Sequence, residues 1–112
     1  MPEITWDDFE KVEIRVGEIV AAEPFPEARK PAIKLTVDFG EAFGTRQTSA
    51  QLTAHYSPDE LIGKQVVAVV NFPPKRIAGF KSEVLVLGVP DTDDEVVLLS
   101  PDQTVPLGAR MF

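Results

Sequence analysis

The chain contains no cysteine, a single histidine and no apolar run long enough to span a membrane. Without cysteine it cannot form disulfides, thiolate metal sites or thiol nucleophiles. The lone imidazole, on His55, cannot supply the usual ligand set of a zinc site. A membrane-spanning helix needs about 20 consecutive apolar residues, so none is predicted. We therefore expect no metal and no membrane segment.

Signals for export and for catalysis are also absent. Residues 1–10 have neither the basic start nor the apolar core of a secretory signal. The predicted location is therefore the cytoplasm, and the lack of cysteine fits a reducing compartment. Gly63-Lys64 resembles the end of a P-loop, but Pro58 stands where the required glycine belongs. No Gly-x-Ser-x-Gly motif is present, and we predict neither an enzyme nor a cofactor.

The length of 112 residues suits one domain. Charges of both signs are present, but they are unevenly distributed along the chain. Residues 1–28 carry eight acids and two bases, and residues 82–112 carry six acids and one base. Residues 29–81 reverse the balance, with eight bases and four acids. A basic surface on an acidic body attracts an anionic partner to one face. The alternative is a chance cluster of solvated charges.

Alternation of apolar and polar residues predicts the strands. Val12 to Val16 alternates, and Gly17 breaks the phase before it resumes at Ile19, which predicts a bulge that bends the first strand. The same pattern predicts a strand at 33–39, and a continuous apolar run predicts one at 66–70 that is buried on both faces. Further strands are predicted at 45–52, 83–89 and 95–99. The loop at 23–31 then connects strands one and two, and the loop at 72–81 connects strands four and five.

Capping patterns predict two short helices, one at 5–11 after Thr5 and one between Ser57 and Gly63. Three strands, a short helix and further strands follow the order of the five-stranded Greek-key OB barrel. A six-stranded sandwich is the alternative, and the helix between strands three and four favours the barrel. We predict an all-β OB fold that forms a single domain over residues 1–112.

On that fold, seven of the central bases occupy the OB ligand face, which comprises strands two and three and the loops joining strands 1–2 and 4–5. They are Arg29, Lys30, Lys34, Arg46, Lys75, Arg76 and Lys81. Phe25 and Phe80 lie in the same two loops, where they either stack on nucleic-acid bases or cap the barrel ends. The pattern predicts a nucleic-acid-binding groove.

Three segments resemble the tRNA-binding OB domain, which is appended to methionyl-tRNA synthetases and also occurs free-standing. They are residues 8–17, residues 70–83 with the sequence Asn71-Phe72-Pro73-Pro74-Lys75, and residues 98–110. The similarity covers essentially the whole chain. Residues 23–31 and 49–51 narrow it to the CsaA-type export chaperones, which are free-standing bacterial and archaeal members.

The resemblance implies a homodimer, tRNA binding, and chaperone activity on unfolded preproteins with the translocase ATPase SecA as a partner. It also implies a binding site at the matching positions, which are Asn71, Lys75, Lys81, Ser82 and Glu83. Arg76 is added to this site on its charge and placement alone. The alternative for Asn71 and Ser82 is to cap the strand ends beside the loop. Two functions therefore remain open: a tRNA-binding module, acting with tRNA or aminoacyl-tRNA synthetases, and an ATP-independent chaperone with apolar pockets.

Large apolar residues gather near both ends of the chain. They are Ile4, Trp6 and Phe9 at one end and Leu107, Met111 and Phe112 at the other. If both ends pack across a twofold axis, they form a self-complementary interface. This pattern predicts that the dimer interface is built from these six residues.

Overall fold

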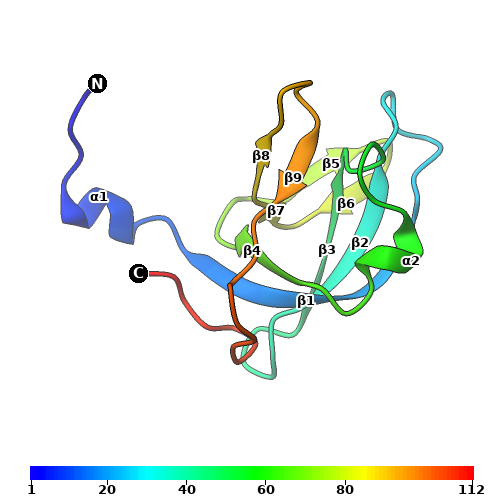
Figure 1. Ribbon diagram of the computed structural model, residues 1–112. Coiled ribbons are helices and arrows are strands. Elements are labelled where there is room, and N and C mark those ends of the chain that lie inside the picture. The colour runs from blue at the N-terminus through cyan, green and yellow to red at the C-terminus, as the bar shows by residue number, and fades with distance from the viewer.

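A strongly bent antiparallel sheet forms the body of the computed structural model, which describes residues 1–112 (Figure 1). Its strand order is β3-β2-β1-β4-β7. The strands are β1 (Ile14–Pro24), β2 (Ile33–Asp38), β3 (Thr45–Ala50), β4 (Gln65–Val69) and β7 (Leu85–Val86). Two hairpins stand beside this sheet, β5 (Lys75–Ile77) with β6 (Phe80–Ser82), and β8 (Gly88–Pro90) with β9 (Val96–Leu98). The helices are α1 (Trp6–Glu10) and α2 (Pro58–Leu61).

The two edges of the sheet, β3 and β7, close on each other through a few hydrogen bonds. The backbone N–H of Glu83 donates to the carbonyl of Gln47 at 2.8 Å, and the Gln47 N–H donates to the Glu83 carboxylate at 3.0 Å. The buried Thr48 hydroxyl donates to the carbonyl of Val84 at 2.7 Å. The sheet is thus a nearly closed five-stranded barrel, which confirms the predicted all-β OB fold over the alternative sandwich.

Gly17 allows β1 to approach the core closely. A Cβ placed there would lie 2.5 Å from Cγ1 of Val37 and 2.9 Å from the ring of Phe39. The predicted bulge at Gly17 is wrong, because Gly17 pairs in regular register with Val66 of β4. The register instead shifts farther along β1, between Ile19 and Ala21 where the strand pairs with β2. The apolar pattern changes phase here because Ile14 and Val16 are buried outside the core cluster, where the C-terminal segment bonds to them, whereas Gly17 and Ile19 face the core.

We expect Gly17→Ala to lower the free energy of unfolding by about 1–3 kcal/mol, the usual cost of overpacking a core. The added methyl group would overlap Val37 and Phe39, both of which are almost fully buried. Urea unfolding measures the effect. Ala21→Val is the control, since it adds methyl groups at an exposed position of the same strand and should change stability by less than about 0.5 kcal/mol. Equal unfolding midpoints for both variants would contradict the packing argument.

The segment predicted as a loop at 72–81 is instead the β5–β6 hairpin. Ala78 and Gly79 at its turn have φ angles of 50° and 81°, the two positive values that a type I′ turn requires. The predicted strand at 83–89 is also divided. Leu87 donates to Val67 of β4, after which the chain leaves the barrel sheet to form the β8–β9 hairpin. Both differences arise from backbone pairing that the side-chain pattern does not reveal.

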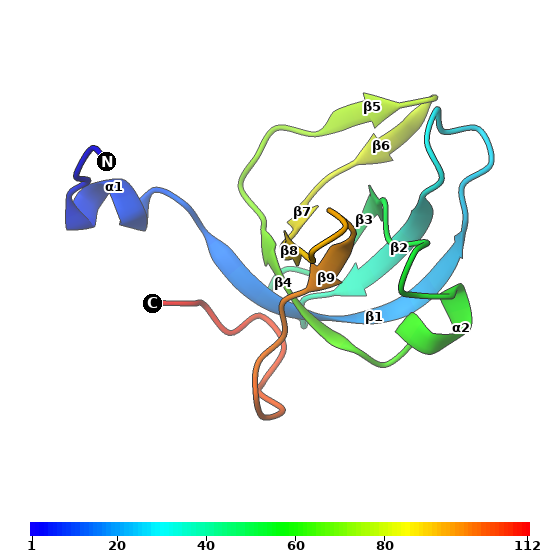
Figure 2. The ribbon, with the colours of Figure 1, turned by 45° about the horizontal axis from the view of Figure 1, so that its top comes forward.

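Both predicted helices are present. In α1 the Thr5 hydroxyl accepts from the backbone of Asp8, and the Thr5 N–H donates to the Asp8 carboxylate, which lowers the pKa of Asp8. Helix α1 projects away from the barrel, whereas α2 lies against it with Leu61 fully buried (Figures 1 and 2). Neither helix has the length or hydrophobicity of a membrane-spanning helix.

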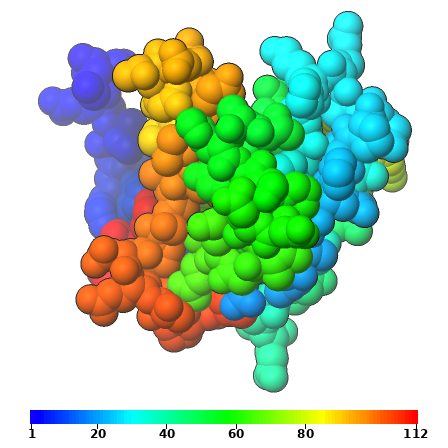
Figure 3. Space-filling model, turned by 45° about the vertical axis from the view of Figure 1, so that its right-hand side comes forward, coloured from blue at the N-terminus to red at the C-terminus, as the bar shows by residue number.

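The C-terminal segment packs against the start of β4 near α2 (Figure 3). The side-chain amide of Gln65 donates to the carbonyl of Val105 at 2.8 Å and accepts from its N–H at 3.1 Å. The Tyr56 hydroxyl accepts from the N–H of Leu98 at 3.1 Å. These bonds fix the last 15 residues to the barrel without adding a strand to the barrel sheet.

Candidate nucleic-acid interface

Two loops rich in basic residues lie side by side at one end of the barrel (Figure 2). They are loop 25–32 and the β5–β6 hairpin, and we refer to them as the basic loops. The rings of Phe25 and Phe80 join them, with centroids 5.4 Å apart in an edge-to-face arrangement. The Lys34 ammonium from β2 lies 4.7 Å from the Phe25 centroid and 5.1 Å from that of Phe80. Aromatic and cation–π contacts therefore hold the two loops together.

This contact distinguishes the two alternatives for Phe25 and Phe80, namely stacking on nucleic-acid bases and capping the barrel end. Phe25 is only 3% exposed, so it has no free face for a base. Phe80 is half-buried and packs against Phe25 and Lys34. Phe25 therefore caps the end of the barrel, and Phe80 packs in the same cluster.

Five basic side chains on these loops are exposed to solvent, and none forms an ion pair with an acid. They are Arg29, Lys30, Lys75, Arg76 and Lys81. The only side-chain hydrogen bond among them is a long one of 3.4 Å from Arg76 to the carbonyl of Gly79. The molecule thus presents a concentrated positive charge at one end although its net charge is −7.

The other two predicted bases differ from these five, because Lys34 lies between the basic loops without being fully exposed and Arg46 lies away from them. Lys34 is half-buried over the aromatic pair. Arg46 lies near the opposite end of β3, where its Nε donates to the carbonyl of Phe43 at 3.4 Å. The sequence placed Lys34 on the polar face of strand two and Arg46 on strand three, but it could not show these neighbours.

Three further predicted site residues have their side chains bonded within the fold. The Asn71 amide donates to the carbonyl of Lys11 at 2.8 Å and accepts from the N–H of Glu13 at 3.0 Å. Ser82 and Thr48 share a hydrogen bond of 3.1 Å between hydroxyls, and Glu83 bonds the backbone of β3. Asn71 anchors the chain just before the hairpin, while Ser82 and Glu83 fasten its far side to β3.

A groove that sequence reasoning missed opens between β3 and the β7–β8 segment, with a volume of about 700 Å³. We call it the edge groove. Its walls come from loop 25–32, the end of β3, Ile77 of β5, and residues of β7, β8 and β9. Most of the lining side chains are aliphatic. No sequence signal marked it, because it lies between strand edges far apart along the chain.

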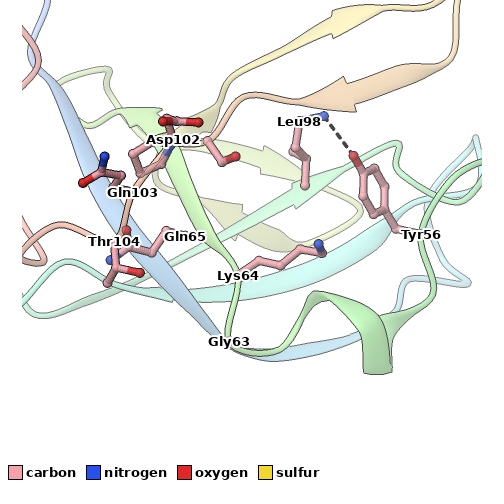
Figure 4. A pocket seen from close by; sticks show the side chains of 10 residues that line it. Tyr56, Gly63, Lys64, Gln65, Leu98, Asp102, Gln103 and Thr104 are labelled. Carbon is pink, nitrogen blue, oxygen red and sulfur yellow. Dashed lines mark hydrogen bonds between the residues drawn. The ribbon is translucent and has the colours of Figure 1, made fainter.

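Other hollows have different characters. A polar pocket of about 270 Å³ lies beside Tyr56, Lys64 and Gln65, where the C-terminal segment is fixed to the barrel (Figure 4). A third hollow of about 320 Å³ lies beside the hairpin, where the exposed Phe72 neighbours Lys75. Phe72, which the sequence prediction did not single out, is the exposed aromatic nearest the basic loops in sequence. No three histidine, aspartate or glutamate residues come together as metal ligands.

The acidic turn between β8 and β9 is fastened to the loop before α2. His55 Nε2 lies 2.6 Å from Oδ2 of Asp91. The backbone N–H of Glu95 and then the His55 ring lower the pKa of Asp91. This contact fixes the β8–β9 hairpin, which forms one wall of the edge groove.

The predicted dimer residues are brought together only in part. Trp6 and Phe9 pack with ring centroids 5.4 Å apart and share a hollow of about 120 Å³ with Met111 and Phe112. Trp6 is 64% exposed and Phe112 98% exposed. We refer to these four residues as the apolar end patch. Ile4 is exposed just before α1, whereas Leu107 lies elsewhere, beside Gly40.

The protein is thus an OB-type barrel with a cluster of unpaired cations on its loops. Residues 14–110 match the family described as "Putative tRNA binding domain", and the chain belongs to that family. The resemblance predicted from three segments is thereby confirmed.

Solved relatives extend over the full length of the chain. The CsaA chaperone of Bacillus anthracis is 53% identical, with a TM-score of 0.91, and the match covers 99% of this chain and 100% of that one. The CsaA chaperone of Picrophilus torridus is 52% identical, with a TM-score of 0.91, over 98% and 100% of the two chains. The protein from Pyrococcus horikoshii described as MetRS-related is 33% identical, with a TM-score of 0.87, over 100% of both.

The matched curated relatives are much longer proteins. The methionine–tRNA ligase of Methanococcus aeolicus is 43% identical over 105 residues, which are 94% of this chain and 15% of the ligase. The ligase of Bacillus subtilis is 39% identical over 111 residues, which are 99% of this chain and 16% of the ligase. The chain thus spans about a sixth of the length of these relatives.

Proposed function

We propose that this protein is a tRNA-binding module whose basic loops hold phosphates of the tRNA backbone. The observation that carries this proposal is the set of five exposed, unpaired cations at one end of an acidic barrel. Phosphate contacts of this kind supply most of the affinity for nucleic acid. In this proposal Asn71, Ser82 and Glu83 hold the hairpin in place, and Lys34 holds the two loops together. The module has no catalytic role and acts in the cytoplasm, where tRNA is found.

A second proposed function is that of an ATP-independent chaperone, and the edge groove favours it. Aliphatic walls of this size suit the apolar side chains of an unfolded segment. The relatives named as CsaA chaperones support the same role. By this resemblance we propose export-bound preproteins as clients and the translocase ATPase SecA as a partner.

We further propose that the protein is a homodimer assembled through the apolar end patch. Exposed aromatic and aliphatic groups of this size are unusual on a barrel of 112 residues unless another surface covers them. A twofold axis would place each patch against its own copy. The apolar end patch shares no residue with the basic loops or with the lining of the edge groove.

The dependence of each activity on salt concentration distinguishes the two proposed functions. Binding of total tRNA and suppression of aggregation of a chemically unfolded client are measured from about 0.05 to 0.5 M KCl, without ATP. Five phosphate contacts should give a slope of log affinity against log salt of about −3.5 to −4.5. Client protection should persist at 0.5 M salt, because apolar burial is not screened and the Debye length is then only about 4 Å.

The result identifies which function is primary. A salt slope near zero for tRNA would remove the basic loops as a phosphate site. Client protection that disappears with salt and is competed away by tRNA would place both ligands on the basic loops. The protein would then be a tRNA-binding module with secondary chaperone behaviour.

A further inference from the structure

The free edge of β3 is the first element of the inference. β3 and β7 are the outer strands of the sheet, joined only near Gln47 and Thr48. The N–H and C=O of Gln47 both bond Glu83, so they point away from β2. Backbone direction alternates along a strand, so the N–H and C=O of Ser49 point the same way. Ser49 lines the edge groove, beyond the last bond that closes the barrel.

The opposite wall also presents strand backbone without a sheet partner. Leu87 donates its N–H to Val67 of β4 at 2.8 Å, so the backbone of Val86 faces the other way, toward the groove. The next residues leave the barrel sheet and pair with β9 instead. Loop 25–32, the end of β3 and the β8–β9 hairpin lie at the same end of the barrel (Figure 1). The groove therefore lies between two strand edges.

The lining of the groove indicates what kind of ligand fits. Its apolar side chains are aliphatic, and no aromatic residue lines it. Single-stranded nucleic acid is usually bound by stacking bases on aromatic side chains, so this groove does not suit RNA. Arg29 and Lys30 are the only charged residues in the lining. An open backbone edge beside aliphatic walls is the arrangement by which proteins bind extended peptides as added strands.

We propose that the edge groove binds an extended peptide segment as an added β-strand on the free edge of β3. Alternate apolar side chains of the peptide occupy the aliphatic walls, and an acidic residue at one end lies near Arg29 and Lys30. This inference rests on the proposed chaperone function and specifies its client: a strand-forming stretch with alternating apolar residues. Backbone hydrogen bonds supply binding that does not depend on one client sequence, and the walls select the alternation.

The test uses a fluorescein-labelled peptide of alternating valine and threonine that ends in two aspartates. Two further peptides carry N-methyl groups either on every valine amide or on every threonine amide. On a strand edge, one alternate set of N–H groups faces β3 and the other faces away. We expect one methylated peptide to bind the wild-type protein at least tenfold more weakly and the other to bind within threefold of the parent. Equal effects of the two sets, whether both small or both large, would overturn the proposal.

A groove-filling variant provides a second measurement. Ala28→Trp places a large side chain in the groove from a loop, and it should weaken peptide binding at least tenfold. Ala42→Trp is the control, because Ala42 is exposed in the β2–β3 turn and does not line the groove. Thermal unfolding checks that both variants fold. Unaltered peptide binding by folded Ala28→Trp would overturn the proposal.

The outcomes distinguish this inference from the function on which it rests. If the wild-type protein neither binds the parent peptide nor protects a client, both the chaperone function and this inference fail. If it protects the client while Ala28→Trp and the methylated peptides behave like their parents, the inference fails alone. If oligouridine displaces the peptide and Ala28→Trp abolishes its binding, the groove is an RNA site and the inference is overturned.

Discussion

Replacing Lys75 and Arg76 together by glutamate is expected to weaken tRNA binding strongly and to leave the thermal unfolding midpoint nearly unchanged. Both side chains are exposed on β5 and neither pairs with an acid, so their reversal removes little stability. Loss of two phosphate contacts should make the salt slope shallower by about 1.4–1.8. The added negative charges also repel the tRNA, so affinity should fall at least about tenfold near 50 mM salt. Filter binding across a salt series measures both quantities.

A control variant with the same change in net charge isolates the position of the charges. Lys11→Glu with Lys64→Glu also reverses two exposed cations, and neither lies on a basic loop. This variant should retain most of its tRNA affinity, because a local cluster and not the total charge binds the phosphates. Equal losses in the two double variants would show that net charge alone is responsible. Full affinity in the Lys75 and Arg76 variant would place the site elsewhere.

Trp6→Ala, or removal of residues 1–9, is expected to convert the proposed dimer into a monomer. Trp6 is the largest side chain of the apolar end patch and packs on Phe9. A buried aromatic at the centre of an interface typically contributes at least about 2 kcal/mol, which weakens the dissociation constant about 30-fold when lost. Sedimentation equilibrium at micromolar concentrations should show a mass near that of one chain, 12.3 kDa.

The control for assembly is Ile62→Ala. Ile62 is an exposed apolar residue at the end of α2, away from the apolar end patch, and its removal should leave the dimer intact. A wild-type protein that sediments as a monomer at micromolar concentration would refute the dimer. A dimer that survives both Trp6→Ala and the truncation would have to form through another surface.

Sequence patterns were most informative where structure depends on near neighbours. The capping residues around Thr5 and Ser57 predicted both helices, since each cap involves groups three residues apart. Alternation in β2 predicted its buried face, because side chains of a strand alternate between core and solvent. The order of these elements then sufficed for the OB fold. The β5–β6 hairpin was missed because Ala78, an unusual residue at positive φ, gives no turn signal.

The sequence sufficed to predict which charged residues belong to the candidate site, but not which residues they contact. The exposed cations of the basic loops were identified because loop position alone makes a lysine or arginine accessible. The role of Lys34 depends on two aromatic rings that meet only in the folded state. Asn71 bonds to groups 58 and 60 residues away, and Thr48 to Val84, 36 residues away. The edge groove likewise exists only after β3 and β7 face each other.

The two hydrogen bonds of Asn71 have a consequence for association. They fasten the chain at Lys11 and Glu13 to the end of β4, and Arg110 donates to the carbonyl of Glu10 at 2.8 Å. The segment that leads to α1 is therefore ordered before any partner arrives, although the helix itself projects into solvent. A surface that packs on Trp6 and Phe9 meets a preorganised arm. Binding there loses less conformational entropy than docking a free tail would, which favours assembly at lower protein concentration.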